Sequence, residues 1–160
     1  MKGLRVGFGY DTHQLKTGRK FVLGGISISN DKGAVAHSDG DVLIHAICDA
    51  LLGAANLGDI GTHFPDNSEE YKDIDSKLLL RKVVKMLEEK NYRIVNIDST
   101  VLLQRPKLKN YIPEMKASLS KVLQQDTNCI SIKATTTENL GFIGREEGIA
   151  AQAVVLIEEE

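Results

Sequence analysis

The stretch DGDVLIHAICDALLGAANL, residues 39–57, decides the fold that this sequence predicts. Apolar side chains fill most positions between Val42 and Leu52, acidic residues open the stretch and Gly58 follows it, which is the pattern of an α-helix. A helix that is apolar on nearly every side is buried. The segments before and after it must therefore supply the elements that cover it.

Those segments show strand and helix patterns in alternation. Period-two or β-rich composition predicts strands at residues 4–10, 21–28, 93–103, 129–136 and 149–157. Helical spacing predicts further helices from Asp75 or Ser76 to Lys90, with Asn91 as the stop, and over residues 111–125. Gly24 and Gly25 predict a bulge in the second strand, and residues 135–148 predict a polar loop.

This mixture of elements predicts an α/β fold of the α+β sandwich type, with a mixed β-sheet and helices on one face. We expect residues 1–160 to form one domain, because no repeat or linker divides the chain. The uncovered face of the sheet needs a partner, so we also expect a homo-oligomer whose order the periodicity leaves open.

Composition excludes several classes of protein. The chain has 160 residues, 42% hydrophobic and 26% charged, and its net charge of −2 gives no basic footprint for nucleic acid. No apolar run approaches the roughly 20 residues that span a bilayer, and Met1–Val6 lacks the features of a signal peptide, so we expect a cytoplasmic protein. Cys48 and Cys129 form no C-x-x-C pair and are expected in the core.

A metal site is predicted where the first strand ends. Asp11 and His13 are two residues apart, so in an extended chain they project to the same side and reach one ion. His45 lies in the apolar helix, one turn from Asp41 and one turn from Asp49. Alone, His45 reads as a core histidine hydrogen-bonded to one of these aspartates; together with Asp11 and His13, it reads as a third ligand.

Oxygen and nitrogen ligands suit zinc, and three protein ligands leave open the fourth position that a catalytic zinc site needs. Asp49 or Asp41 is the expected hydrogen-bond partner that fixes the tautomer of His45. His63 is a rival ligand that the spacing does not exclude.

Three other segments suggest phosphate binding. Residues 36–41, AHSDGD, place His37 and Ser38 before the apolar helix, where they form an anion cradle, an N-cap at Ser38 or Asp39, or both. Residues 133–138, KATTTE, offer hydroxyls and a carboxylate for phosphate and a cation such as Mg²⁺, or a capping box. Residues 104–107, QRPK, add two cations beside a turn, and no P-loop or nucleophile elbow is present.

Taken together, these runs resemble the 2-C-methyl-D-erythritol 2,4-cyclodiphosphate synthases. The resemblance rests on motifs in the family's order and spacing over essentially the whole chain: DTH at 11–13, AHSDGD at 36–41, GDIG at 58–61, FPD at 64–66, RPK at 105–107, and KATTTE at 133–138 followed by GF at 141–142.

The resemblance implies a homotrimer packed through the sheets, with active sites between neighbouring subunits. It implies conversion of 4-diphosphocytidyl-2-C-methyl-D-erythritol 2-phosphate into 2-C-methyl-D-erythritol 2,4-cyclodiphosphate, with release of CMP, in the non-mevalonate route to isoprenoids. It also implies a zinc ion on Asp11, His13 and His45, and a Mg²⁺ or Mn²⁺ ion on Glu138.

The resemblance further implies catalytic roles for His37 and Thr136, which with Ser38 position the phosphates and stabilise charge in the transition state. Contacts with the erythritol part of the substrate are implied at Asp59, Ile60, Gly61, Phe64, Pro65, Asp66, Asn67 and Ser68. Contacts with cytidine, largely through backbone groups, are implied at Leu103, Gln104, Arg105, Pro106, Lys107, Leu108, Lys109, Ala134, Thr135 and Thr136. Further substrate contacts are implied at Asp11, Thr12, His13, Thr137, Glu138, Phe142 and Arg145.

Phe142 and Arg145 are also implied to lie near the trimer axis, where the family has a cavity that accepts isoprenoid diphosphates. Two other functions fit the same residues. One is a zinc phosphohydrolase that uses a metal-bound water and releases inorganic phosphate. The other is a non-catalytic trimer that binds isoprenoid diphosphates.

Overall fold

The apolar segment forms helix α1 (Val42–Ala54), which packs against one face of a five-stranded sheet. The computed structural model describes residues 3–160; Met1 and Lys2, part of the argument against a signal peptide, lie outside them. The sheet order is β4 (Lys32–Val35), β1 (Leu4–Thr17), β7 (Gly148–Glu159), β5 (Tyr92–Leu102) and β6 (Ile130–Thr135).

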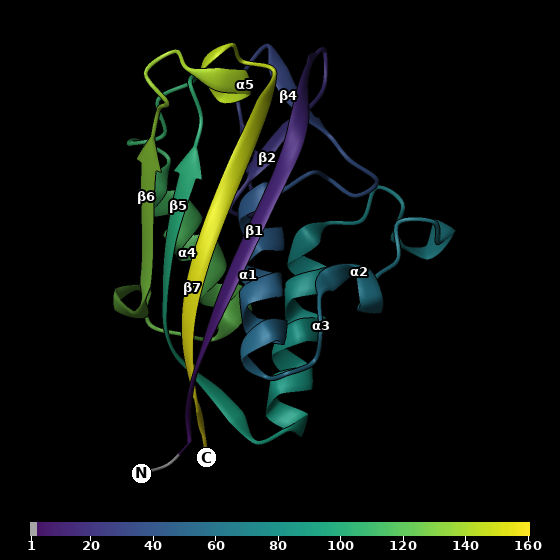
Figure 1. The fold of residues 1–160 in the computed structure, drawn as a ribbon, viewed down its shortest axis with the longest axis vertical. Helices are drawn as coiled ribbons and strands as arrows, with labels where there is room; N and C mark the ends of the chain where they lie inside the picture. Colours follow the sequence, from purple (N-terminus) through teal and green to yellow (C-terminus); the bar gives the residue numbers. More distant parts are fainter. Residues whose placement is uncertain (1–2) are drawn as a thin grey trace.

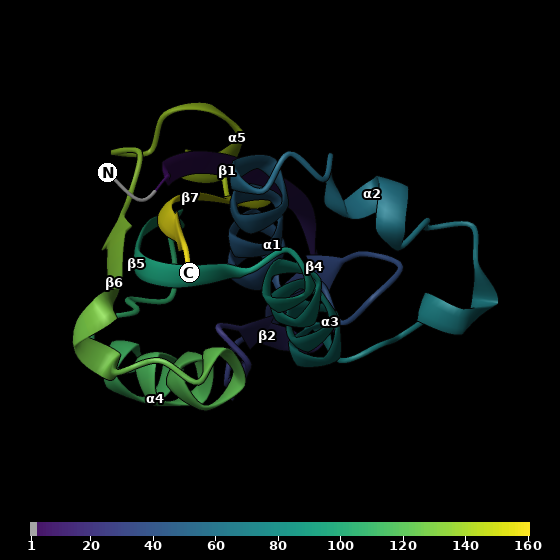
Figure 2. The same ribbon diagram turned by 90° about the horizontal axis from the view of Figure 1, so that it is seen from below.

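The sheet is mixed, as predicted. β1 pairs antiparallel with β4 and β7, β7 pairs antiparallel with β5, and β5 pairs parallel with β6. The three long helices, α1, α3 (Ser76–Glu89) and α4 (Ile112–Leu123), lie on the same side of it (Figures 1 and 2). The short helix α2 (Ile60–His63) and the 3₁₀ turn Glu69–Tyr71 form an excursion that projects beyond this layer (Figure 2). The α+β sandwich is therefore confirmed.

Gly7 and Gly9 of β1 allow α1 to pack closely against the strand. A Cβ added at Gly7 would lie 1.8 Å from the carbonyl oxygen of Ala50, and one at Gly9 would lie 1.9 Å from that of Ala46. No side chain fits in that space, so the helix backbone rests directly on the strand backbone. This close contact brings the next inward residues of β1 against the first turn of α1.

Several local predictions were wrong. Gly24 and Gly25, with φ of 59° and 77°, form the turn of a hairpin between β2 (Phe21–Leu23) and β3 (Ile26–Ile28) instead of a bulge. β1 does not end at Tyr10 but runs to Thr17, because its second half pairs with both β4 and β7. The loop over residues 135–148 contains a short helix, α5 (Gly141–Gly144).

Helix ends were predicted better at α3 than at α1. Asp75 caps α3, and Asn91 follows it with φ of 58°, in the left-handed conformation that ends helices. Helix α1 is capped by Asp41, whose carboxylate accepts from the backbone N–H of Ile44, and not by Ser38 or Asp39. Cys48 is buried as expected, whereas Cys129 is half-buried at the end of the 3₁₀ turn Thr127–Cys129, and both are free thiols.

The face of the sheet opposite the long helices carries large apolar side chains in the open. Val6 is 69% exposed and Phe8 is 60% exposed, and both lie on the outer side of β1. Their neighbours on this face include Leu4, Tyr10 and Val154. We call this set the outer apolar face. No helix among residues 3–160 is long and apolar enough to cross a membrane.

Candidate active site

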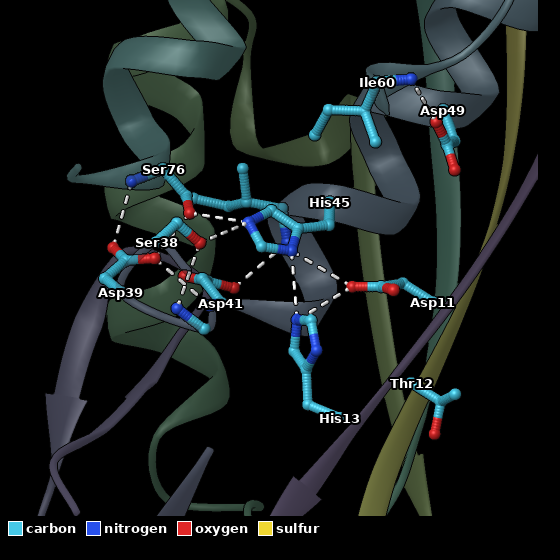
Figure 3. Close-up of polar contacts among 12 residues, drawn as sticks. Asp11, Thr12, His13, Ser38, Asp39, Asp41, His45, Asp49, Ile60 and Ser76 are labelled. Carbon is cyan, nitrogen blue, oxygen red and sulfur yellow. Dashed lines mark hydrogen bonds and ion pairs between the residues drawn. The ribbon is translucent and has the colours of Figure 1, made fainter. Parts of the chain in front are cut away.

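Asp11, His13 and His45 converge on one point, as the sequence predicted. Asp11 and His13 come from β1 and His45 from α1, across the close strand–helix contact (Figure 3). His45 Nδ1 lies 3.0 Å from Asp11 Oδ2 and 3.1 Å from His13 Nε2, and the last two atoms are 3.0 Å apart. These residues form a potential metal-binding cluster.

The spacing of these atoms fits a tetrahedral ion. Ligands about 2.0–2.1 Å from a zinc ion at tetrahedral angles lie roughly 3.3 Å from one another. The observed separations of 3.0 to 3.1 Å are within a few tenths of an ångström of that value. The separations of the three side chains are therefore compatible with a shared ion.

Electrostatics prepares the cluster for a cation. Burial raises the pKa of Asp11, but hydrogen bonds from His13 and His45 outweigh it, so the pKa of this carboxyl lies well below its usual range. Burial lowers the pKa of His45, but the Asp11 carboxylate outweighs this effect and the net pKa is raised. Asp11 is therefore ionised at neutral pH, and a metal ion would displace a proton held by the cluster.

The predicted hydrogen-bond partners of the His45 ring were wrong. The Asp41 carboxylate accepts from the backbone N–H groups of Gly24, Gly25 and Ile44, so it ties the β2–β3 turn to the start of α1. The Asp49 carboxylate accepts from the backbone N–H of Ile60 at 2.7 Å. Among residues 3–160, neither carboxylate makes a hydrogen bond with the His45 ring.

Two serines take that place instead. His45 Nε2 lies 2.9 Å from Ser76 Oγ and 3.2 Å from Ser38 Oγ (Figure 3). Ser76 is 31 positions from His45 in sequence, so no local spacing could reveal it. The rival ligand His63 lies outside the cluster, with its Nε2 2.7 Å from the carbonyl oxygen of Leu57.

The cluster opens into a cavity of about 510 Å³, which we call the metal-side cavity. Predicted substrate contacts that line it are Asp11, His13, His37, Ser38, Ile60, Gly61, Phe64, Pro65, Asp66 and Asn67. Tyr71, Ile74 and Leu79 also line it and were not predicted. Asp59 instead caps α2 through Thr62, and Ser68 holds the His37 ring through its carbonyl oxygen, 2.9 Å from His37 Nε2.

A second cavity, of about 320 Å³, lies beyond the ends of β5 and β6. We call it the loop cavity. Of the residues expected around cytidine, those that line it are Leu103, Gln104, Pro106, Lys107, Leu108, Lys109, Ala134, Thr135 and Thr136. Ile112 completes the lining and was missed. Arg105 does not line the cavity, because its guanidinium makes a bidentate contact of 2.7 and 2.8 Å with the Glu146 carboxylate.

Four other predicted residues do not line the loop cavity. Glu138 is exposed, and its carboxylate accepts from Thr136 Oγ1 at 3.3 Å. Thr137 Oγ1 donates to the carbonyl oxygen of Leu140, and Arg145 pairs with Glu147. Thr12 faces away from the cluster, with its Oγ1 donating to the carbonyl oxygen of Ile149 (Figure 3).

The two cavities share no lining residue. β7 and β5 separate β1 from β6, so the two strands are three strand spacings apart, about 14 Å. Among residues 3–160, Glu138 is not part of the metal cluster.

A family model of the YgbB family matches residues 4–158. The chain belongs to the YgbB family. A relative from Bacteroides fragilis, named 2-C-methyl-D-erythritol 2,4-cyclodiphosphate synthase, is 61% identical over 154 residues, which is 96% of this chain and 97% of the relative. A relative of the same name from Thioalkalivibrio sulfidiphilus is 57% identical over 99% of both chains. The resemblance inferred from the motifs is thus confirmed.

Two solved structures are also similar to this chain. The bifunctional IspDF of Campylobacter jejuni matches with a TM-score of 0.96 and 41% identity; the whole of this chain is covered, but it spans only 43% of that longer protein. The CDP complex of IspF from Plasmodium falciparum matches with a TM-score of 0.88 and 37% identity, covering 100% of this chain and 99% of that one.

Proposed function

We propose that this chain converts 4-diphosphocytidyl-2-C-methyl-D-erythritol 2-phosphate into 2-C-methyl-D-erythritol 2,4-cyclodiphosphate and CMP, in the methylerythritol phosphate route to isoprenoids. The observation that carries the proposal is the Asp11–His13–His45 cluster at the base of the metal-side cavity. The relatives that share nearly the full length of the chain are named for this synthase activity.

We propose zinc as the ion of the cluster and Mg²⁺ or Mn²⁺ as the ion held by Glu138. A carboxylate and two imidazoles match the preferences of zinc, and an exposed carboxylate beside threonine hydroxyls matches those of a harder cation. When bound, such cations polarise phosphate oxygens and neutralise charge that develops on the diphosphate.

The side chains around the cluster position the substrate. His37 and Ser38 line the metal-side cavity before the N-terminus of α1, where they bind phosphate oxygens. The hydrogen bond between His37 and the carbonyl of Ser68 limits the orientation of the ring. Thr136 lines the loop cavity and donates to the diphosphate; a single fixed donor of this kind is worth about 2.7–4 kcal/mol in the transition state.

The absence of a general base in the proposal follows from the chemistry. The attacking group is a phosphate oxygen that is already anionic at neutral pH, so no side chain has to remove a proton. The barrier is repulsion between two anionic groups, together with the entropy of ring closure. Holding both ends of one substrate lowers the entropic part by several kcal/mol.

We propose further that the chain acts as a homotrimer with each active site shared by two subunits. Two observations support this arrangement. The metal-side cavity borders β1 and the loop cavity borders β6, three strand positions away, and the two share no lining residue, so a substrate that needs both groups favours a site shared by two chains. The outer apolar face exposes large side chains that a neighbouring sheet would bury.

We also propose that an isoprenoid diphosphate binds near the axis of this trimer, at the end of the fold that carries α5. Leu140 is 72% exposed, and Phe142 and Arg145 are exposed beside it. Apolar groups next to a guanidinium match a ligand with a hydrocarbon chain and a diphosphate.

The decisive experiment is incubation of the protein with the cytidylyl substrate, zinc and magnesium, followed by phosphorus NMR of the products. We expect CMP and a cyclic diphosphate, with no inorganic phosphate. Release of inorganic phosphate would point to a phosphohydrolase. Binding of an isoprenoid diphosphate without any release of CMP, at saturating metal, would contradict the synthase and favour a non-catalytic binding protein.

A further inference from the structure

His45 is held from behind by a chain of hydrogen bonds that reaches another part of the fold. Its Nδ1 faces Asp11 and His13, and its Nε2 faces Ser76 Oγ at 2.9 Å. Ser76 Oγ in turn lies 2.5 Å from Asp39 Oδ1 (Figure 3). The imidazole, the hydroxyl and the carboxylate therefore form a continuous path, His45–Ser76–Asp39.

The donors and acceptors along this path can be assigned. An ionised carboxylate only accepts, so the Ser76 hydroxyl donates its proton to Asp39. The Ser76 oxygen is then left with lone pairs and accepts from the Nε2–H of His45. A neutral imidazole with its proton on Nε2 presents a free lone pair at Nδ1, which is the atom that faces the cluster.

The path is fixed in place by the backbone. The second oxygen of Asp39 accepts from the backbone N–H of Ser76 at 3.0 Å, and the backbone N–H of Asp39 donates to the carbonyl of Ile74 at 3.1 Å. Asp39 Oδ1 also accepts from the backbone N–H of Asp41 at 3.1 Å. Ser76 is 0% exposed, so water does not compete for its hydroxyl.

We propose that Ser76 and Asp39 are positioning residues for the metal ligand His45, selecting the Nε2–H tautomer so that Nδ1 is free to bind the ion. The inference rests on the metal site of the proposed function but not on the reaction. Ser38 lies 3.2 Å from the same nitrogen, but it lines the metal-side cavity and its Oγ also accepts from the backbone N–H of Gly40. Ser76 is therefore the closer and better-anchored partner.

The first test measures zinc affinity by competition with a chromophoric chelator. Ser76→Ala removes the hydroxyl but keeps the backbone N–H that binds Asp39, so the connection between the two segments survives. We expect the zinc dissociation constant to rise by about 10–100-fold, the usual effect of losing a group that orients a metal ligand. Asp39→Asn should weaken zinc binding in the same direction.

The matched control is Ser99→Ala. Ser99 is also buried, and its hydroxyl donates to the carbonyl of Ser131 at 2.8 Å, so it makes no contact with the path His45–Ser76–Asp39. We expect it to lower thermal stability about as much as Ser76→Ala while leaving zinc affinity unchanged. The conservative variant Ser76→Thr, which keeps a hydroxyl, should recover most of the affinity. If Ser76→Ala binds zinc as tightly as Ser99→Ala does, the proposal is wrong.

The second test needs no variant. Long-range ¹H–¹⁵N NMR of the zinc-loaded protein distinguishes the two imidazole tautomers, and the chain has only 4 histidines to assign. We expect the His45 proton on Nε2, and a proton on Nδ1 would overturn the inference. Wild-type protein that binds zinc but releases no CMP would overturn the proposed reaction alone, whereas protein that binds no zinc would overturn both.

Discussion

The metal-side cavity and the loop cavity differ in how they are built. The potential metal cluster lies across the contact between β1 and α1, and the far side of its His45 ring is held by the buried Ser76. The loop cavity is formed by chain segments that follow β5 and β6, and Thr135, Thr136 and Glu138 are exposed. In the proposed active site, one chain thus provides the whole metal cluster of the metal-side cavity, whereas its loop cavity remains an open surface.

This difference has a physical origin in β1. Glycines at positions 7 and 9 allow backbone contact between the strand and the helix, which brings Asp11 of β1 to 3.0 Å from His45 of α1. No comparable contact fixes Glu138, which has a positive φ of 52° in an exposed turn. The proposed trimer explains the contrast, since a neighbouring subunit would cover the loop cavity.

The largest effect is expected from His45→Ala, which breaks the metal side alone. Four-ligand zinc sites bind the ion with roughly 10–16 kcal/mol, which corresponds to about 3 kcal/mol for each ligand. Loss of one ligand should therefore lower zinc affinity at least about a hundredfold. Turnover should be abolished while circular dichroism stays close to that of the wild type. His63→Ala is the control, because His63 lies outside the cluster. Full activity of a metal-stripped His45→Ala protein would refute the ligand assignment.

Gly9→Ala should break the same side through the backbone. Its Cβ would lie 1.9 Å from the carbonyl oxygen of Ala46, so α1 must move away from β1. We expect a loss of at least about 1–3 kcal/mol in the free energy of unfolding, with weaker zinc binding. Gly53→Ala, on α1 with nothing within 4 Å of the added Cβ, should instead stabilise by up to about 1 kcal/mol. Denaturant titrations of both variants measure the free energy of unfolding. Equal values for Gly9→Ala and Gly53→Ala would contradict the packing argument.

Phe8→Glu tests whether the loop cavity depends on a neighbouring subunit. A carboxylate on the outer apolar face should dissociate the proposed trimer and lower turnover at least about tenfold, while zinc affinity per chain is kept. Light scattering coupled to gel filtration would measure the mass. Leu78→Glu, an exposed apolar position on α3, is the control and should stay trimeric. An active Phe8→Glu monomer would show that one chain suffices.

Glu138→Gln should give the smallest effect, and it tests the proposed cation ligand on the loop-cavity side of the active site. Loss of the charge should shift the magnesium titration of activity to higher concentration and lower turnover, by about tenfold if one cation contact is weakened by roughly 1.4 kcal/mol. Zinc affinity should not change, because Glu138 is not part of the cluster. An unchanged magnesium titration would argue against Glu138 as a ligand, and Glu89→Gln on α3 controls for the loss of a surface charge.

Much of the fold and part of the candidate site could be predicted from residue patterns. The apolar run of α1 predicted a buried helix, the strand patterns predicted a mixed sheet, and the spacing of Asp11 and His13 predicted ligands on one side of a strand. These features depend on the period of a helix or of a strand, which is a local property and can be read from residue spacing.

Only the tertiary structure decided which distant segments meet. It replaced Asp41 and Asp49 by Ser76 as the partner of the His45 ring, it turned Arg105 toward Glu146, and it set one cavity beside β1 and the other beside β6. Spacing in the chain carries no information about such contacts, because they depend on how whole elements pack and which backbone groups are already satisfied. Ser76 lies 31 residues from His45, and only the packing of α3 beside α1 brings them together.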